Sequence, residues 1–290
     1  MLKSMRPLVA AAATAAALAA ATSPAQAADP TGDFAPFKYC PYTNPDVQSC
    51  LHSLTTSGSF KLGNSTVPVS APITLQGGFT LSEDALTTTF FPAVGADTLS
   101  KTKLDVPGGL VGIVSTDPLA GPLLDLFYAV VAGANGVKAT AELVGPVGFN
   151  YLNFVIGSGT VITLPLRIHL ENPFLGPNCY IGAADDPVTL ELTAGTTNPP
   201  PPNQPISGSV GDVTTNPEAT VVTAAGVRLV DNAFSVPRAR GCGSTFVDQP
   251  LVTAAVNLKN GLPSAAGNNH AILRGTNKVG DRGAVQASAG

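Results

Sequence analysis

The feature that most constrains the fold of this chain is the alternation of apolar and polar residues in many short segments. The clearest segment runs from Thr160 to Glu171. The side chains expected on its apolar face are Ile162, Leu164, Leu166, Ile168 and Leu170. Because successive side chains of a strand point to opposite faces of a sheet, this pattern predicts a half-buried strand. Pro165 cannot donate a ladder hydrogen bond, so we expect the strand to lie at a sheet edge or to contain a bulge there.

Similar alternation predicts strands along most of the chain. Gly63-Asn64 stands between two alternating segments and predicts a hairpin turn. Two stretches have helical spacing instead: one runs from Pro122 to Val131, and the other follows Asp248 and ends near Gly261. The other predicted strands cover residues 73–75, 86–91, 110–114, 137–143, 188–192, 221–224, 227–230 and 271–274. Many short strands with Gly and Pro turns indicate a mainly β chain, with a β-sandwich-like sheet-on-sheet fold and one or two short helices.

A proline-rich segment at residues 198–205 is the expected boundary within the chain. Its consecutive prolines, Pro199–Pro202, favour a stiff polyproline II conformation and donate no ladder hydrogen bonds. The segment is either a domain linker or a long rigid loop that crosses one fold. It separates a β-rich lobe at residues 28–197 from a second β-rich lobe at residues 206–290, and we expect the two lobes to form one structural unit.

The amino-terminal residues have the order of a secretory signal peptide, which we predict at residues 1–27. Lys3 and Arg6 precede an apolar run, Leu8–Ala21, and Ala25-Gln26-Ala27 is a cleavage site of small residues. A membrane anchor is the alternative, but a spanning helix needs about 20 apolar residues and this run is shorter. Stable membrane insertion is not expected from any later segment either. The expected location is therefore extracellular, as a secreted protein.

Four cysteines in an exported chain predict two disulfides. They are Cys40, Cys50, Cys179 and Cys242. Of the three pairings that four cysteines allow, Cys40 with Cys50 is favoured, because the two are close in sequence and flank a turn. That leaves Cys179 with Cys242, which would tie the two lobes together. A metal site is the alternative, but the chain has no C-x-x-C or H-x-x-H pair, and we predict no metal and no cofactor.

Sparse charge excludes several kinds of partner. Charged residues make up 12% of the chain, about half the average of roughly 25% for globular proteins. Removal of Lys3 and Arg6 with the signal peptide lowers the basic count from 15 to 13 against 19 acids, which gives a formal net charge of −6. No Lys or Arg cluster is present, so binding to nucleic acid or to an anionic lipid surface is not expected. A cell-surface component or an apolar small molecule remains as a partner.

Four stretches between residues 164 and 276 resemble a known group of proteins. They read LPLRIHLENPFLGPNCYIG, PVTLELTAGTTNPPPPNQPISG, LVDNAFSVPRARGCG and GLPSAAGNNHAILRGT. Together they resemble uncharacterised secreted proteins of high-GC Gram-positive bacteria, and the resemblance covers mainly the carboxyl-terminal half of the chain. That group has no known activity. The resemblance therefore implies an extracellular location and no catalytic residue.

The motifs that could indicate catalysis are incomplete. Ser207-Gly208-Ser209-Val210-Gly211 lacks the first glycine of a nucleophile elbow. Gly157-Ser158-Gly159 lacks the spacing of a phosphate loop and precedes a predicted strand instead of a helix. Asn64-Ser65-Thr66 fits an N-glycosylation acceptor, but it also forms the predicted hairpin turn. We predict no catalytic or cofactor-binding residue from these motifs.

Two groups of titratable residues have both a structural and a chemical interpretation. His169 shares the polar face of its strand with Arg167 and Glu171, where it either pairs with local charges or acts as a general base. The sequence shows no nucleophile to accompany it. Asp185-Asp186 lies in a loop, where the carboxylates are either solvated or bind calcium or act as acid and base. His52 follows Cys50 closely, and we expect the disulfide turn to hold it in place.

These observations support three hypotheses about function. The first is a non-catalytic secreted β protein with a surface, structural or partner-binding role, because no catalytic constellation is found. The second is an extracellular carrier of an apolar ligand held between sheets. It is suggested by the apolar excess and by the segment Leu119–Val131, which could line a cleft, and it requires a large apolar cavity. The third is a secreted hydrolase that uses His169 or the Asp185-Asp186 pair.

Overall fold

The computed structural model describes residues 28–82 and 87–290, so the predicted signal peptide at residues 1–27 lies outside the described residues. The strands are β1 (Ser49–Leu62), β2 (Ser65–Pro68), β3 (Ile73–Leu81), β4 (Thr88–Pro92), β5 (Lys103–Asp105), β6 (Lys138–Leu143), β7 (Gly148–Phe149), β8 (Thr160–Glu171), β9 (Tyr180–Ile181), β10 (Val188–Thr193), β11 (Asp212–Thr215), β12 (Val221–Asp231), β13 (Ala239–Arg240) and β14 (His270–Asp281). The helices are the 3-10 helix η1 (Gly32–Phe37) and α1 (Gly109–Ile113), α2 (Pro122–Ala134), α3 (Tyr151–Ile156), α4 (Gln249–Asn260) and α5 (Arg282–Ser288).

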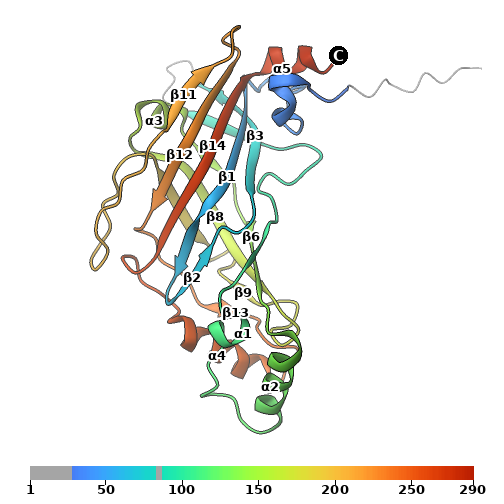
Figure 1. The fold of residues 1–290 in the computed structure, drawn as a ribbon, viewed down its shortest axis with the longest axis vertical. Coiled ribbons are helices and arrows are strands. Elements are labelled where there is room, and N and C mark those ends of the chain that lie inside the picture. Colours follow the sequence, from blue (N-terminus) through green and yellow to red (C-terminus); the bar gives the residue numbers. More distant parts are fainter. Residues whose placement is uncertain (1–27, 83–86) are drawn as a thin grey trace, which may run out of the picture.

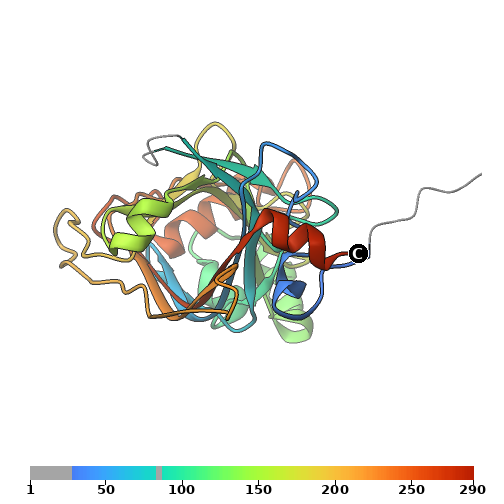
Figure 2. The same ribbon diagram turned by 90° about the horizontal axis from the view of Figure 1, so that it is seen from above.

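All described strands belong to one 14-stranded sheet with the order β13-β9-β8-β10-β12-β14-β1-β3-β4. On the other side of β8 lie β6 and β7, while β2, β5 and β11 extend β1, β6 and β12. The sheet curls around an interior, with α1, α2 and α4 at one end and η1 and α5 at the other (Figures 1 and 2). The prediction of a mainly β chain is confirmed. A sandwich of two separate sheets is not confirmed, because the strands are linked into one ladder.

The curl brings β3 and β4, at one end of the strand order, toward β7, which pairs with β8 near the other end. Phe79 of β3 contacts Phe149 of β7 edge to face, with ring centroids 5.0 Å apart. It also stacks on Tyr151 at 5.6 Å. The Tyr151 N–H donates to the hydroxyl of Thr88, in β4, at 3.4 Å. Aromatic side chains therefore pack across the line where β3 and β4 approach β7.

A single glycine lies where two neighbouring ladders bend. Gly275 of β14 pairs with Thr55 of β1 and with Val227 of β12. Both ladders shift register at this level, as a β-bulge does. A Cβ atom at Gly275 would lie 1.8 Å from the carbonyl oxygen of Leu54, so only glycine allows this approach. Because bulges increase the local twist of a strand, this position contributes to the curl of the sheet.

The strand predicted at residues 160–171 is present as β8, but its predicted position was wrong. β8 lies inside the sheet, between β10 and the pair β6 and β7. Pro165 is accommodated because the segment opposite it, between β6 and β7, leaves the ladder, whereas β8 continues without a bulge at this residue. β6 ends at Leu143 and β7 begins at Gly148, and the intervening turn passes Pro165. The Pro165 carbonyl still accepts the N–H of Val144, at 3.0 Å. The N–H that Pro165 lacks would have faced this turn and not a paired strand.

The segment at residues 110–114, predicted as a strand, forms the helix α1 instead. Leu110 and Ile113 are both buried, and their spacing of three residues places them on one helix face. Gly108 begins the helix with a φ of 76°. The helix packs at the closed end of the sheet, where the carbonyl of Ile113 accepts the side-chain amide of Asn260 at 2.9 Å. A run of five apolar residues is compatible with a strand and with a helix, and the contact with Asn260 selects the helix.

Both predicted helices are confirmed, as α2 and α4. α4 begins after Asp248 and ends at Gly261, which has a φ of 61°. The remaining helices were not predicted, and α3 and α5 are capped by local side chains. Asn150 accepts the N–H of Asn153, and Asp281 accepts the N–H of Ala284, both at 2.9 Å. Among the described residues, no helix is long and apolar enough to cross a membrane.

The two disulfides join the favoured cysteine pairs. Cys40–Cys50 connects the turn after η1 to β1, and Cys179–Cys242 connects the start of β9 to the chain after β13. The proline-rich segment at residues 198–205 runs between β10 and β11. Strands that precede it and strands that follow it share the one sheet, since β12 and β14 lie between β10 and β1.

Candidate functional site

The interior of the curled sheet contains three neighbouring apolar cavities. Their volumes are about 50, 40 and 30 Å³. The inward side chains of β8 line them in sequence: Ile162 and Leu164 border the 40 Å³ cavity, Leu166 borders that cavity and the 50 Å³ one, and Leu170 borders the 30 Å³ one. Between Ile162 and Leu170 a strand advances by roughly 27 Å. The cavities therefore follow each other along the interior for most of the length of β8.

Adjacent cavities share walls. Phe60, Ile73 and Ala141 border both the 50 Å³ and the 40 Å³ cavities. Leu62 and Val67 border both the 50 Å³ and the 30 Å³ cavities. Movement of a few side chains would join the three spaces into one narrow bore. At its lower end in Figure 1 the bore is closed by α1 and α4, through Ile113 and Asn260.

Among the described residues that line the three cavities no side chain is charged, and the hydroxyls at the largest of the three have partners. Ser100 and Thr102 are the polar side chains of the largest cavity. Their hydroxyls lie 2.9 Å apart, and that of Thr102 donates to the carbonyl of Pro72 at 2.7 Å. Each cavity exceeds the volume of about 10–15 Å³ that one water needs, but a water gains little without two to four polar partners. The walls therefore favour an apolar guest over water.

A second concave site, named here the β10 groove, lies where β10 and β12 diverge. This open groove has a volume of about 330 Å³. It is lined by Pro187, Thr189, Glu191, Asp231, Ala233, Phe234, Ser235 and Ala266. Unlike the interior cavities, it is lined by two carboxyl groups, of which Glu191 is exposed and Asp231 is buried.

Asp231 is the most constrained group of the β10 groove. Its side chain is 3% exposed, and its two carboxylate oxygens accept the backbone N–H groups of Glu191 at 2.7 Å and of Ala233 at 2.9 Å. Burial raises the pKa of the Asp231 carboxyl above its ordinary value, because the charged form loses hydration, and the two N–H bonds oppose that effect. Asp231 thus connects β10 to the chain that follows β12.

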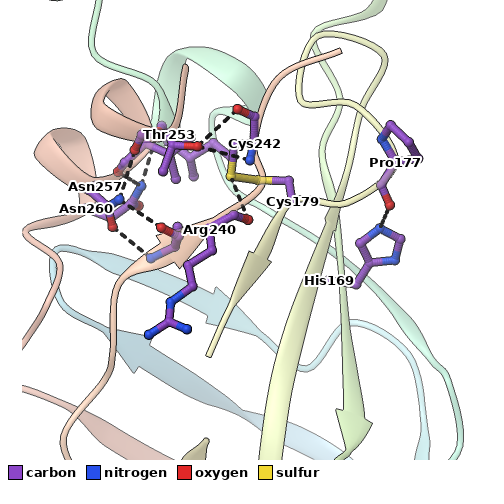
Figure 3. Close-up of a disulfide and its surroundings, with 11 residues drawn as sticks. His169, Pro177, Cys179, Arg240, Cys242, Thr253, Asn257 and Asn260 are labelled. Atoms are coloured by element: carbon purple, nitrogen blue, oxygen red, sulfur yellow. Dashed lines mark hydrogen bonds between the residues drawn. A yellow bond between two sulfur atoms is a disulfide. The ribbon is translucent and has the colours of Figure 1, made fainter. Parts of the chain in front are cut away.

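His169 lies in a cluster of charged and aromatic side chains on the outer face of β6, β8 and β9. Its Nδ1 lies 4.0 Å from Glu142 and 3.8 Å from Glu171, and its ring stacks on Tyr180 at 4.5 Å. Its Nε2 lies 3.1 Å from the carbonyl of Pro177 (Figure 3). Within the described part of the chain, no Ser, Thr or Cys hydrogen-bonds to this ring. The geometry matches the expected charge pairing on a strand face, and the general-base hypothesis gains no partner from it.

The same cluster holds two further ion pairs. Arg167 donates to Glu142 at 2.8 Å and lies over the ring of Tyr180. Lys103 hydrogen-bonds to Glu171 and lowers the pKa of that carboxyl. These contacts connect neighbouring strands on the surface, where a single pair adds little to stability.

The other residues singled out in the sequence are dispersed. Asp185 and Asp186 both face Arg240, at 3.7 and 3.4 Å. His52 lies in β1 beside Lys278 of β14, and burial, followed by the charge of Lys278, lowers its pKa. Ser209 forms a backbone bridge with Arg228, which is a structural role. In the described ranges no three His, Cys, Asp or Glu side chains lie close enough to hold a metal ion.

The disulfide Cys179–Cys242 lies beside α4 (Figure 3). The backbone N–H and carbonyl of Cys242 both hydrogen-bond to the hydroxyl of Thr253, at 3.1 Å in each case. Asn257, one turn later, donates to the carbonyl of Ala239 and accepts its N–H. The disulfide therefore fixes α4 and β13 to β9.

Comparisons with known proteins return no match to this chain, whether against family models, curated proteins or solved structures.

Sequence reasoning proposed the wrong segment for the cavity wall and missed the β10 groove. Leu119–Val131, expected to line an apolar cleft, borders none of the three cavities. The alternation of β8 identified its inward leucines and isoleucines before the structure showed what they enclose. Asp231 directly follows the strand predicted at residues 227–230, and no local motif marks it. The only signal was an acidic residue at the end of an apolar strand, which is common in surface loops.

Proposed function

We propose that this protein is a secreted, extracellular carrier that holds a linear aliphatic ligand inside its curled sheet. The observation that carries the proposal is the row of adjoining apolar cavities along β8. The bore is narrow, so it favours an extended chain over a fused-ring ligand. Its walls are uncharged, so the enclosed part of the ligand is uncharged too. The disulfides and the predicted signal peptide support an extracellular location.

Burial of the aliphatic chain supplies the binding energy. Each methylene transferred from water to an apolar site contributes about 0.8 kcal/mol, which corresponds to about a fourfold change in Kd. A ligand that fills the bore therefore binds through many equal increments. This predicts affinity that rises steadily with chain length and stops rising when the bore is full.

The ligand has a route of entry beside the largest cavity. β2 pairs with β1 and β5 pairs with β6, but in the described chain β2 and β5 are not paired with each other. Val67 of β2 and Leu104 of β5 both border the 50 Å³ cavity. Separation of these two strands breaks no backbone ladder, and it opens the cavity to solvent.

Titration with diphenylhexatriene, a rod-shaped apolar dye that fluoresces in apolar surroundings, tests the proposal. We expect saturable uptake and displacement by n-alkanols, with about fourfold tighter competition for each added methylene. Ala141→Phe fills the wall shared by the two larger cavities and should abolish uptake. Ala132→Phe, on the exposed side of α2, is the matched control and should leave uptake unchanged.

Two outcomes would overturn the carrier proposal. One is dye binding that does not saturate or that alkanols of any length fail to displace. The other is equal uptake by the Ala141→Phe and Ala132→Phe proteins. If Ala141→Phe does not fold because the added ring overpacks the core, the alkanol series on the unaltered protein still decides, since surface adsorption would show no limiting chain length.

Among the described residues, the structure brings no catalytic group to His169 or to the Asp185-Asp186 pair, so the hydrolase hypothesis does not enter this proposal. The hydrolase and the partner-binding roles stay predictions from the sequence. Unchanged turnover after His169→Ala and Asp186→Asn would rule out the roles assigned to these residues in a hydrolase.

A further inference from the structure

The β10 groove exists because β10 has a backbone ladder on one side only. β10 pairs with β8 from Val188 to Thr193, but with β12 through the single pair Thr193 and Val230. From Pro187 to Glu191 the other edge of β10 faces the open groove. A strand edge with unpaired N–H and C=O groups is a template for another extended chain.

The direction of the free backbone groups follows from the pairing with β8. Thr189 lies opposite Pro165, which has no N–H, and the Pro165 carbonyl bonds to Val144 on the far side of β8. Thr189 therefore directs its own N–H and C=O away from β8. Glu191, two residues on, shows the same direction, since its N–H points into the groove toward Asp231. No described strand pairs with Thr189 on this side.

Asp231 already occupies one of the positions that an added strand would use. Its carboxylate accepts the Glu191 N–H at 2.7 Å, as a strand carbonyl would. The edge is therefore formed and competent to bond. The groove is also held at both ends. At one end lies the Thr193–Val230 pair. At the other end, the β13–β9 pairing and the disulfide Cys179–Cys242 fix the chain that follows β12. A rigid frame reduces the entropy lost on binding.

The charge of the groove selects the occupant. Among the described residues that line it, Glu191 and Asp231 are the titratable ones, and Lys, Arg and His are absent. Glu191 is exposed, whereas Asp231 is buried with both oxygens bonded to N–H groups, so Glu191 supplies the accessible charge. Carboxylates beside a strand edge oppose pairing with a second copy of this acidic chain. They favour a segment that carries Lys or Arg.

We propose that the β10 groove binds an extended, positively charged segment of a partner protein, which adds to the sheet beside β10. The backbone of the segment pairs with the Thr189 edge, and a cationic side chain pairs with the exposed Glu191. This site is separate from the interior bore, so its occupancy does not depend on the carrier function.

Fluorescence anisotropy with a labelled seven-residue peptide of alternating Thr and Lys tests the proposal, with the Thr and Glu peptide of the same length as the comparison. We expect saturable binding of the Lys peptide, weakened by added salt, and no binding of the Glu peptide. Glu191→Gln keeps the size of the side chain and removes its charge, and it should weaken binding by about threefold. Glu218→Gln, in the turn between β11 and β12, is the matched control and should have no effect.

Thr189→Pro removes the groove-facing N–H without removing a bond to β8, so it should weaken binding of the Lys peptide by at least about tenfold. A Lys peptide N-methylated at alternate residues provides the same test on the unaltered protein if the variant does not fold. Equal binding of the Lys and Glu peptides would overturn the proposal. The proposal would also fail if the Lys peptide kept full affinity with either set of alternate residues N-methylated. Self-association of the protein that is lost in the Thr189→Pro variant would show that the edge binds a second copy instead.

Discussion

The two sides of β12 differ in how they are held. Toward β14 the strand is paired from Val221 to Asp231, interrupted by one bulge. On its other side β12 pairs with β11, with Ser209 and, through Val230 alone, with β10. β12 then ends at Asp231, whose side chain accepts the N–H of Glu191. The β14 side therefore closes the wall around the cavities, and beyond the end of β12 the edge of β10 has no partner among the described strands. The comparison shows that one strand can serve as a core element on one side and border a recognition site on the other.

The difference arises from the path of the chain beyond each strand. β14 continues beside β12 for the whole length of both, and its Gly275 permits close contact on either side. The chain after β12 instead leaves β10 and returns to the sheet at β13, which pairs with β9. The groove is the space left by that detour.

The largest predicted loss of stability comes from a change in β14, the strand that pairs with β12 along its whole length. Gly275→Val places a side chain where a Cβ atom alone would lie 1.8 Å from the Leu54 carbonyl. We expect a loss on the order of 4–5 kcal/mol of unfolding free energy, or failure to fold, because the ladder between β1 and β14 must separate. Urea unfolding monitored by circular dichroism measures it.

Gly226→Ala is the matched control for that substitution. Gly226 lies at the β12 bulge with a φ of 71°, and nothing lies within 4 Å of its added Cβ atom. The expected cost is only the strain of a positive φ, about 1–2 kcal/mol. Equal losses for the two variants would show that close approach at Gly275 does not hold the ladder.

The next largest predicted loss of stability comes from removal of the disulfide Cys179–Cys242, which holds one end of the β10 groove. The Cys179–Cys242 disulfide spans 63 residues and Cys40–Cys50 spans 10. By loop-closure entropy, replacing the first pair with Ser should cost about 4 kcal/mol and the second about 3 kcal/mol. Urea unfolding of the two double variants compares them. The Cys179→Ser, Cys242→Ser protein should also lose binding of the Lys peptide, whereas the Cys40→Ser, Cys50→Ser protein should retain it.

Retention of peptide binding by both disulfide variants, at urea concentrations where both are folded, would contradict the role of Cys179–Cys242 as part of the groove frame. A larger loss of stability from the Cys40–Cys50 variant would contradict the loop-length argument.

The smallest expected effect is a pH dependence at Asp231. Because burial raises its folded pKa above the unfolded value of 3.8, the folded protein binds more protons than the unfolded chain between these two pKa values. The stabilisation is therefore fully present below pH 3.8 and is lost as the pH rises through the folded pKa. Unfolding free energies from pH 3 to 7 should fall more steeply with pH for the unaltered protein than for Asp231→Asn. Parallel profiles would show that Asp231 does not titrate differently in the two states.

Local patterns were sufficient for the parts of this fold that depend on neighbouring residues. The alternation from Ile162 to Leu170 identified the side chains that line the bore, and the signals at Asp248 and Gly261 located α4. The same local reasoning failed for residues 110–114, where five apolar residues suit a strand or a helix and the contact with Asn260 decides. It also misplaced β8, because it could not show that the turn between β6 and β7 makes room for Pro165.

Local patterns were therefore enough to predict that the chain is mainly β, which face of β8 is apolar, which cysteines are close enough to pair, and where the two longest helices lie. Each of these follows from side-chain chemistry and backbone preference within a few residues. The folded chain adds features that no local pattern contains: the strands curl into one sheet around a row of apolar cavities, Gly275 meets two bulges at once, and Asp231 accepts a hydrogen bond from the edge of β10. These features depend on which distant segments pair, and that is set by the packing of the whole chain and not by any local pattern.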